Sequence, residues 1–436
     1  MSSTLLLIAG LVVLCALLGA GAPIFIGFLV VNLLGVLALF GTAGFGMFAG
    51  SMLESMSSLS LTTIPLFVLM GEILFRSGAV DVVLDSVDHL VGRIHGRLYL
   101  FTMVLSTLFG ALCGSAVAVV AMLGRTVLPT MHARGYDARL SASLIQGGAS
   151  LAPIIPPSLM AVLIGSMANV SISSLLIAGL LPGLLLAAMS VGYAWWCLWR
   201  DPSLAPREDA SATIGPRQPL RALARLLPFT VIIFAVMGLM LLGVATPSEA
   251  AATGVMGSLA TAAWYRRLSW AMLQESIRST VTIASMILVI LAVSVFFGQL
   301  LNFTGATAQL VERLATIDLP PMAMFWLLMI VPFVLCMFID QLAFMLVAIP
   351  IYAPLAARLG FDPVWFWTQF SINMTLASLT PPFGYTMYAL RAAAPDLLTM
   401  KQVFDASWPI TWVFVAGMAV MSVFPGIITW LPGLLK

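Results

Sequence analysis

Two pairs of adjacent prolines, each inside a long apolar segment, are the residues of this sequence that most clearly indicate chemistry. Pro156-Pro157 lies within Ala152–Ser158, and Pro381-Pro382 lies within Leu379–Gly384. Proline has no N–H and clashes with the preceding helical turn, so each pair breaks a helix. Inside a bilayer such a break is tolerated only where protein or a cavity surrounds the freed carbonyls. Two matching breaks in two halves of a chain therefore indicate the binding site of a secondary transporter.

The unwound backbone at the two breaks suits a sodium ion. A hard cation prefers oxygen ligands, which the carbonyls around Ala152–Pro156 and Thr380–Pro381 supply. Hydroxyl groups close enough in the sequence to join them belong to Ser150, Ser158, Thr375 and Thr380. The helix that restarts after each break carries free N–H groups and partial positive charge at its N-terminus. This polarity favours an anionic substrate, such as a carboxylate.

Asp340 is the most informative single acidic residue, because it lies between two apolar stretches. A carboxylate at membrane depth costs about 2.5–3.5 kcal/mol on insertion scales, so it needs a partner or a cation. One interpretation is a sodium or proton site, and the other is a carboxylate that caps the following helix. Ser115 lies 225 residues earlier. Its hydroxyl group could bind a cation or simply cap the following helix, and the sequence leaves both interpretations equally open.

Glu72 could gate the pathway or pack against a polar neighbour. Arg391 could bind a substrate carboxylate or mark the end of a helix.

The composition is that of a polytopic membrane protein. Hydrophobic residues make up 61% of the 436 residues and charged residues only 8%, whereas soluble domains carry about 25% charged residues. There is no basic tract for nucleic acid, and the four cysteines and three histidines indicate neither a disulfide framework nor a transition-metal centre. No GxxxxGK[ST] sequence is present. An ion gradient would therefore drive any uphill transport.

Turn-forming residues recur with a nearly constant spacing. Gly135-Tyr136-Asp137 is followed 225 residues later by Gly360-Phe361-Asp362, and the proline pairs have the same spacing. We therefore expect two structural repeats, 1–200 and 227–436, joined by a cytoplasmic linker at 201–226. Each repeat is predicted to hold a re-entrant helical hairpin and a broken transmembrane helix. These are about 98–133 and 138–168 in the first repeat, and about 322–356 and 364–391 in the second, with hairpin tips near Ser115 and Asp340.

The charge distribution predicts the topology. Five crossings per repeat would invert the second copy. With the linker in the cytoplasm, the only basic residues that would fall on the periplasmic side are Arg313, Arg358 and Lys436. This asymmetry follows the positive-inside rule, so both termini are predicted to be periplasmic. The expected fold class is an all-α polytopic membrane protein with two inverted-topology repeats. Val80–Val91 is amphipathic, which suits a helix in the membrane interface or an ordinary surface helix.

The motifs resemble those of the large membrane subunit of tripartite ATP-independent periplasmic (TRAP) transporters. The likeness is carried in order by Ile64–Phe67 with Gly71-Glu72, Gly114–Ala116, Pro153–Ser158, Ala245–Ala251 and Leu379–Gly384. The resemblance implies sodium-coupled import of a small organic acid anion, such as a C4-dicarboxylate, a 2-oxo acid or a sugar acid, across the bacterial inner membrane. It implies a scaffold with a mobile, elevator-type transport domain. It also implies a small four-span membrane subunit and a periplasmic substrate-binding protein as partners, and Na⁺ as coupling ion with no cofactor.

By motif position, the resemblance puts sodium between each hairpin tip and its broken helix, with substrate between the two sites. The sodium-binding residues would be Gly114, Ser115, Ser150, Pro156, Asp340, Thr380 and Gly384. The candidate substrate-binding residues are Pro157, Ser158, Thr375, Pro382 and Arg391, of which Arg391 does not map onto a general role in the family. Gly147-Gly148-Ala149 departs from the family pattern, in which small hydroxyl residues are commoner before the first break.

Two other functions are compatible with parts of the sequence. A self-sufficient sodium–dicarboxylate symporter would use the same hairpins without a binding protein. A membrane-embedded enzyme would need a nucleophile with a base, or paired acids on facing spans. No Ser–His or Cys–His pairing occurs at membrane depth, and Glu72 and Asp340 have no clear acidic mate. We therefore expect no enzymatic activity.

Overall fold

The computed structural model of the chain describes residues 9–10, 12–14, 16–17, 20, 22–77, 95–206, 218–305, 308–309, 312, 319–337, 341–382 and 384–435. Asp340, the hairpin tip predicted there and the amphipathic segment Val80–Val91 lie outside the described residues. Within the described ranges all regular secondary structure is helical. This confirms the all-α fold class.

The helices follow one another with short connections. Their bounds are α2 (Ile24–Phe40), α3 (Gly44–Met56), α4 (Thr63–Arg76), α6 (Arg97–Cys113), α7 (Ala116–Ala133), α8 (Ala138–Ala149), α9 (Leu159–Ala168), α10 (Ile172–Ala178), α11 (Leu180–Arg200), α12 (Gln218–Leu241), α13 (Pro247–Trp264), α14 (Trp270–Phe303), α16 (Pro321–Cys336), α17 (Gln341–Arg358), α18 (Pro363–Ser378), α19 (Tyr385–Ala393), α20 (Met400–Val423) and α21 (Gly426–Thr429). Helix α12 already begins within the segment predicted as the linker.

Several helices are suited to a bilayer. Within the described ranges, five stretches are long and apolar enough to cross a membrane, namely Ile24–Met56, Ala116–Ala133, Ile172–Arg200, Trp270–Phe303 and Met400–Val423. A spanning helix needs about 20 predominantly apolar residues. The chain is therefore a multi-pass membrane protein.

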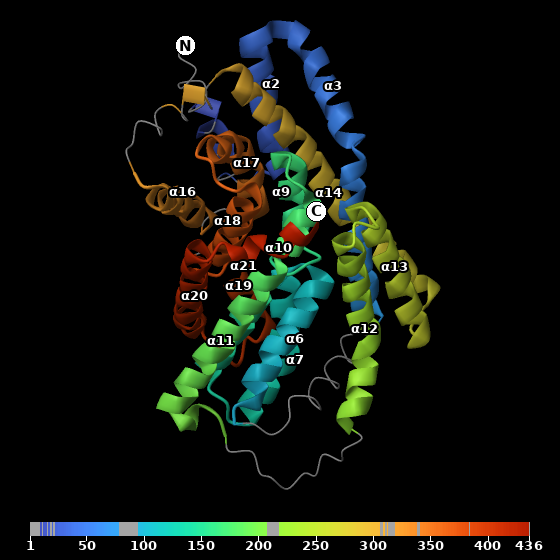
Figure 1. The fold of residues 1–436 in the computed structure, drawn as a ribbon, viewed down its shortest axis with the longest axis vertical. Helices are drawn as coiled ribbons and strands as arrows, with labels where there is room; N and C mark the ends of the chain where they lie inside the picture. Colours follow the sequence, from blue (N-terminus) through green and yellow to red (C-terminus); the bar gives the residue numbers. More distant parts are fainter. Residues whose placement is uncertain are drawn as a thin grey trace.

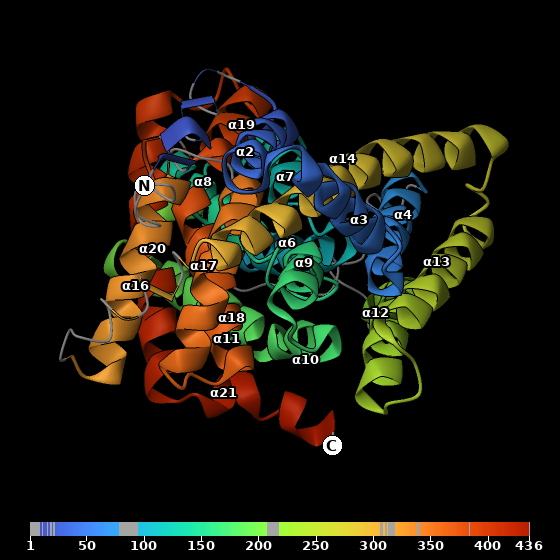
Figure 2. The ribbon, with the colours of Figure 1, turned by 90° about the horizontal axis from the view of Figure 1, so that it is seen from above.

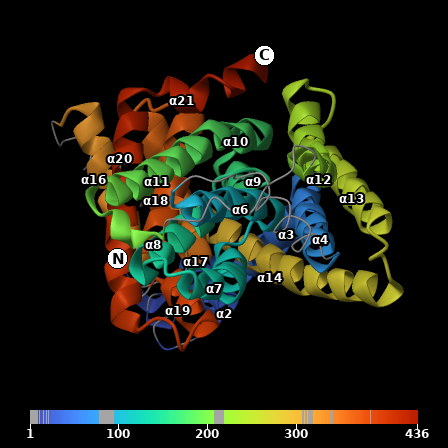
Figure 3. The ribbon, with the colours of Figure 1, turned by 90° about the horizontal axis from the view of Figure 1, so that it is seen from below.

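The helices form two groups, and Figures 2 and 3 show α4, α12 and α13 of one group set apart from most of the other helices. The scaffold helices are α2, α3, α4, α12, α13 and α14, in which α13 packs on α4 and α14 packs on α2, α3 and α4. The hairpin body contains α6 to α11 and α16 to α21. Helices α12 and α13 lie on the outer side of α4, away from most of the hairpin body.

The hairpin body holds two helical hairpins and two interrupted helices. Helices α6 and α7 pack together, as do α16 and α17. Figure 1 shows α6 and α7 in the lower half of the molecule and α17 in the upper half, so the two hairpins lie in opposite halves. Helix α8 is separated from α9, and α18 from α19, by the segments that contain the proline pairs. Both Pro156-Pro157 and Pro381-Pro382 peptide bonds are cis.

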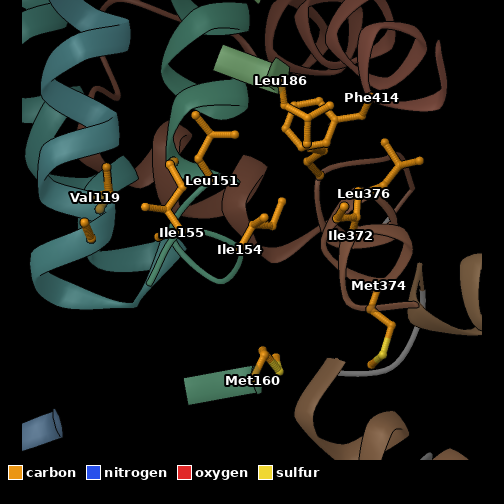
Figure 4. Close-up of a cluster of buried hydrophobic side chains, with 14 of the residues drawn as sticks. Val119, Leu151, Ile154, Ile155, Met160, Leu186, Ile372, Met374, Leu376 and Phe414 are labelled. Carbon is orange, nitrogen blue, oxygen red and sulfur yellow. The ribbon is translucent and has the colours of Figure 1, made fainter. Parts of the chain in front are cut away.

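The main hydrophobic core extends through both groups of helices and includes the first break. Figure 4 shows Leu151, Ile154 and Ile155 of that break among the core side chains Val119, Met160, Leu186, Ile372, Met374, Leu376 and Phe414. These residues come from α7, α9, α11, α18 and α20. The irregular backbone of the break is thus enclosed by packed helices, which is the condition for an interrupted helix at membrane depth.

Candidate functional site

The tip of the first hairpin lies against the first break. Gly114 ends α6 with φ +61°, a left-handed conformation that glycine adopts without steric cost. A side-chain carbon added there would lie 3.4 Å from the carbonyl oxygen of Pro157. One turn earlier, a carbon added at Gly110 would lie 3.0 Å from the Cα of Ala152. Glycine at 110 therefore allows the hairpin backbone to approach the broken helix closely, whereas glycine at 114 suits the left-handed backbone at the tip.

Ser115 starts the second arm of this hairpin. Its hydroxyl oxygen accepts a hydrogen bond from the N–H of Ala118 at 3.4 Å, so Ser115 is the N-cap of α7. The capping interpretation is therefore present in the structure. A hydroxyl oxygen has a second lone pair, so the cap leaves a cation interaction open.

Ser158 closes the first break. Its hydroxyl donates to the carbonyl of Pro153 and accepts from the N–H of Ala161 at 3.2 Å, which caps α9. Ser150 is buried, and its hydroxyl donates to the carbonyl of Gln146 at 2.9 Å. No protein hydrogen bond reaches the carbonyls of Ala152, Ile154 and Pro156 within the described ranges. Oxygens of this kind are the ligands that a hard cation prefers.

The second break is held by a hydroxyl group of its own and by hydroxyl groups from two helices, α19 and α20. Thr380 donates to the carbonyl of Leu376 at 2.8 Å, and its oxygen lies 3.3 Å from the hydroxyl oxygen of Thr411 on α20. Thr386 on α19 donates to the carbonyl of Ser378 at 3.1 Å. Gly384 is required for this packing, because an added side-chain carbon would lie 2.5 Å from the carbonyl oxygen of Ser378.

A cavity of about 640 Å³ lies where the hairpin body meets the scaffold helices. It falls within the range of about 300–1,000 Å³ typical of small-molecule sites. The hairpin body contributes Gly114, Ser115, Ala116, Val117, Ala118, Pro153, Pro157, Leu159, Met160, Gln341, Leu342 and Tyr385. Helices α4 and α14 contribute Phe67, Val68, Gly71, Glu72, Phe75, Ile283, Met286 and Ile287.

The N-termini of four helices meet at this cavity. Its lining includes the first residues of α7 (Ala116), α9 (Leu159), α17 (Gln341) and α19 (Tyr385). Each of these helices carries partial positive charge at its N-terminus. Glu72 is the only described lining residue that bears a formal charge, and no arginine or lysine is among them. The cavity can therefore hold an anion by helix N-termini without a cationic side chain.

Among the described lining residues, the one acidic group, Glu72, has a counter-charge that it shares with Glu275. Arg76 Nε lies 2.9 Å from Glu72 Oε2, one helical turn away on α4, and Arg76 Nη1 lies 2.7 Å from Glu275 Oε2 on α14. This ion pair lies on the scaffold side of the cavity. It joins the two helices that form that wall.

The predicted site residues do not all lie together. Gly114, Ser115 and Pro157 line the cavity, whereas a second set is buried within the hairpin body: Ser150, Pro156, Ser158, Thr375, Thr380 and Gly384. Thr375 donates to the carbonyl of Ser371 in its own helix at 2.9 Å. Pro382 is exposed beside the second break, and Asp340 lies outside the described residues.

Arg391 lies away from the cavity. It is in the last turn of α19, and its Nη1 donates to the carbonyl of Pro395 at 2.6 Å. Arginine at a helix C-terminus interacts favourably with the exposed carbonyls and the helix dipole. This geometry favours the helix-end interpretation over contact with a substrate carboxylate.

Sequence reasoning missed the cavity residues Gln341, Met160 and Tyr385 and the contribution of α14. Gln341 directly follows Asp340, and that adjacency is the only signal in the sequence that could have identified it. The others look like ordinary apolar or aromatic residues of membrane helices. Their role depends on which helix face meets the cavity.

Comparison with known proteins identifies the family. The family model described as "Tripartite ATP-independent periplasmic transporter, DctM component" matches residues 11–427. The chain belongs to this family. It is thus a TRAP transporter large permease. Members of this family are transporter proteins, and each is one component of a tripartite system. The resemblance seen in the sequence motifs is confirmed.

Relatives of this TRAP permease have been assigned different substrates. The chain is 30% identical to the sialic acid permease SiaM of Vibrio cholerae over 96% of both proteins. It is 29% identical to the ectoine/5-hydroxyectoine permease UehC of Ruegeria pomeroyi over 85% of this chain and 86% of that protein. It is 26% identical to the C4-dicarboxylate permease DctM of Rhodobacter capsulatus over 99% of both.

A solved structure shares the fold. The crystal structure of the Alcanivorax borkumensis YdaH transporter superposes with a TM-score of 0.66 at 14% identity, covering 89% of this chain and 90% of that one. At this identity the likeness concerns the fold alone.

Proposed function

We propose that this TRAP permease imports a small organic acid anion, driven by an inward Na⁺ gradient, after a periplasmic binding protein delivers the anion. The observation that carries the proposal is the cavity at which α7, α9, α17 and α19 begin. Helix N-termini bind carboxylates through their N–H groups and dipoles. Because the described lining has no cationic side chain, a bound cation would add the remaining positive charge.

Sodium would bind on the hairpin side of the cavity. The carbonyls of Ala152, Ile154 and Pro156 accept no protein hydrogen bond within the described ranges, and the Ser115 hydroxyl lies at the adjoining tip. In the second repeat, Asp340 and Thr380 are the corresponding candidates. Binding of Na⁺ would place positive charge close to the substrate anion. Such proximity couples the two binding events electrostatically.

The transport step would be an elevator-type movement. The cavity lies between the hairpin body and the scaffold helices α4 and α14, so displacement of one group against the other would carry the bound anion. The two hairpins in opposite halves of the molecule (Figure 1) suit access from opposite sides. The protein would lie in the bacterial inner membrane with both termini periplasmic.

The partners would be a small four-span membrane subunit and a periplasmic binding protein. Members of the family are components of a tripartite transporter, and three relatives of this chain are named for organic solutes of different structure. The substrate of this chain would be a small organic acid such as a C4-dicarboxylate, a 2-oxo acid or a sugar acid. Its identity would follow from the ligand of the binding protein.

The experiment begins with affinity purification of the tagged chain and identification of the proteins that co-purify. The complex is reconstituted in liposomes, and uptake of the radiolabelled ligand of the binding protein is measured under inward Na⁺ or K⁺ gradients. We expect uptake that needs both Na⁺ and the binding protein. Uptake under either gradient would contradict sodium coupling, and uptake by the chain alone would favour the self-sufficient symporter.

Two variants test the sodium site. Asp340→Ala and Ser115→Ala should each weaken the dependence of uptake on Na⁺ concentration, because each removes a candidate oxygen ligand. Ser171→Ala is the matched control, since Ser171 is likewise an N-cap serine whose oxygen accepts from Ser174 N–H at 3.2 Å. Unaltered sodium dependence in Asp340→Ala would remove that residue from the site.

A further inference from the structure

One hydrogen bond joins the scaffold helices to the second hairpin through a carbonyl that its own helix cannot satisfy. Pro350 lies inside α17 and has no N–H, so the carbonyl of Leu346, four residues earlier, lacks its usual helical donor. The hydroxyl of Ser294 on α14 donates to this carbonyl. Both residues are buried. A scaffold residue therefore completes the backbone hydrogen bonding of the hairpin body.

The two helices pack closely around this hydrogen bond. A side-chain carbon added at Gly298, one turn after Ser294, would lie 2.9 Å from the Cβ of Pro350. The side chain of Leu346 belongs to a cluster of buried residues that includes Phe297 of α14. Glycine at 298 thus allows the proline turn of α17 to lie directly on α14. The contact depends on the present register of these two helices.

A second carbonyl of this hairpin is freed in the same way but is satisfied within the hairpin. Pro332 inside α16 leaves the carbonyl of Leu328 without its helical donor. The hydroxyl of Tyr352 on α17 donates to that carbonyl at 3.0 Å. This hydrogen bond would move with the hairpin. The hydrogen bond from Ser294 would not, because its donor and its acceptor belong to different groups of helices.

Movement of the hairpin body along the scaffold would separate Ser294 from Leu346. The carbonyl would then lose its donor at membrane depth, where no bulk water replaces it, and an unpaired carbonyl there costs free energy. A contact that is present in one conformation and absent in another stabilises the first relative to the second. The hydrogen bond therefore favours the conformation of this structure.

We propose that Ser294 is a positioning residue for transport, whose hydrogen bond to the carbonyl of Leu346 holds the second hairpin on α14 and breaks when the hairpin body moves. This inference rests on the proposed function, because it assumes the elevator-type movement. It goes beyond that function by identifying a contact that sets the balance between two conformations. Pro350 is part of this device, since it leaves the carbonyl dependent on Ser294.

The test measures the balance between the conformations directly. Spin labels are attached to Arg267→Cys, which follows α13, and to Lys401→Cys in the first turn of α20, after the four native cysteines are replaced by alanine. Both labelled positions are exposed. The distance between the labels is measured by pulsed electron paramagnetic resonance for the purified permease complex in lipid nanodiscs, in KCl and in NaCl. One distance should agree with this structure and another should report the displaced conformation.

Two substitutions should remove the preference for the described conformation by opposite routes. Ser294→Ala leaves the carbonyl of Leu346 unpaired in both conformations, whereas Pro350→Ala supplies an N–H that satisfies it in both. Each should lower the ratio of the described to the displaced conformation about fivefold, the effect of one hydrogen bond. The double variant should lower the ratio no further than Pro350→Ala alone, because both changes remove the same preference.

Tyr352→Phe is the matched control. It removes the hydroxyl that donates to Leu328, which is also a proline-freed carbonyl of the second hairpin. Because this hydrogen bond lies within the hairpin, its loss affects both conformations equally. The variant should lower the melting temperature and keep the wild-type ratio. A merely structural role for Ser294 would give the same result in Ser294→Ala.

The inference is overturned by an unchanged ratio in Ser294→Ala, by an equal change in Tyr352→Phe, or by a further fall in the double variant. Sodium-driven uptake by the reconstituted complex is measured in parallel. If that uptake persists, the role of Ser294 alone fails; if it is absent, the proposed function fails as well. A single distance in every variant, in KCl and in NaCl, would overturn both this role and the elevator-type movement.

Discussion

Arg76 Nη1 lies 2.7 Å from Glu275 Oε2, so an ion pair joins α4 to α14 between residues 199 positions apart. The same guanidinium lies 2.9 Å from the carboxylate of Glu72, which lines the cavity. Arg76 therefore supplies a counter-charge that Glu72 shares with Glu275, and it links the two helices that form this wall.

Replacing Arg76 with Ala should weaken uptake of the organic anion, because the carboxylate of Glu72 then faces the cavity without a counter-charge. We expect the apparent KM to rise several-fold. The side chains are partly exposed, and such pairs contribute only about 0–1 kcal/mol to stability, so the melting temperature should change little. The measurement is uptake against substrate concentration in proteoliposomes.

Two further variants control for this charge effect. Glu72→Gln combined with Arg76→Ala should restore the KM, because both charges are gone from the wall. Arg278→Ala removes an exposed charge on α14 outside the cavity lining and should leave the KM unchanged. A KM in Arg76→Ala equal to that of the wild type would show that Glu72 does not act on the substrate.

Gly179→Ala should distort the first break. A side-chain carbon at Gly179 would lie 2.1 Å from the carbonyl oxygen of Ile154, a backbone atom that cannot move freely. Overpacking of this kind costs about 1–3 kcal/mol. We expect a lower melting temperature together with weaker dependence of uptake on Na⁺, since a candidate sodium ligand is displaced.

The matched control for this variant is Gly192→Ala in α11. A carbon added at Gly192 meets no atom within 4 Å, and alanine is favoured over glycine within a helix by about 1 kcal/mol. This variant should keep or raise the melting temperature and transport normally. Equal effects of the two substitutions would contradict the contact with Ile154.

Ser158→Ala should affect both stability and transport. The variant loses the cap on Ala161 N–H and frees the carbonyl of Pro153, and loss of an N-cap costs about 0.5–2 kcal/mol. Ser269 caps α14 through Met272 N–H at 3.2 Å, so Ser269→Ala loses an equivalent cap without touching a break. Thermal unfolding and sodium-dependent uptake are measured for both. Normal uptake by Ser158→Ala would argue against a role for the break geometry.

The loop after α11 should show a small dependence of stability on pH. Hydrogen bonds from the Ser203 hydroxyl and then from its N–H lower the pKa of the Asp201 carboxyl. A lowered pKa in the folded state stabilises the protein above the unfolded pKa, and this contribution is lost as pH falls through the folded pKa. The loop matters because the carbonyl of Leu204 accepts from Tyr99 at 2.7 Å and from Asp137 N–H at 2.9 Å.

The variant Asp201→Asn isolates this contribution. Its melting temperature should be slightly below that of the wild type at neutral pH, and the difference should shrink as the pH falls below the ordinary range of aspartate, about 3.9. Measurements run from neutral pH to about pH 3. A difference that is constant across this range would mean that the carboxylate charge makes no contribution.

The positions of the helix breaks and of the first hairpin tip could be predicted from the sequence. Each depends on the backbone chemistry of a few consecutive residues: proline ends α8 and α18 before Pro156-Pro157 and Pro381-Pro382, and glycine at 114 with serine at 115 separates α6 from α7. The composition and the apolar segments likewise predicted an all-α membrane protein. These properties are local, so no tertiary contact is needed to infer them.

The composition of the cavity was decided by tertiary structure alone. Gln341, Tyr385 and Met160 belong to different helices, and their neighbours in the sequence do not reveal which face of each helix meets α4 and α14. Arg76 and Glu275 form their ion pair only because those two helices pack side by side. For Arg391 the sequence left substrate contact and a helix end open, and in the structure its side chain donates to the carbonyl of Pro395 at the end of α19. Backbone preferences act over a few residues, whereas the groups that meet in a cavity depend on how whole helices pack.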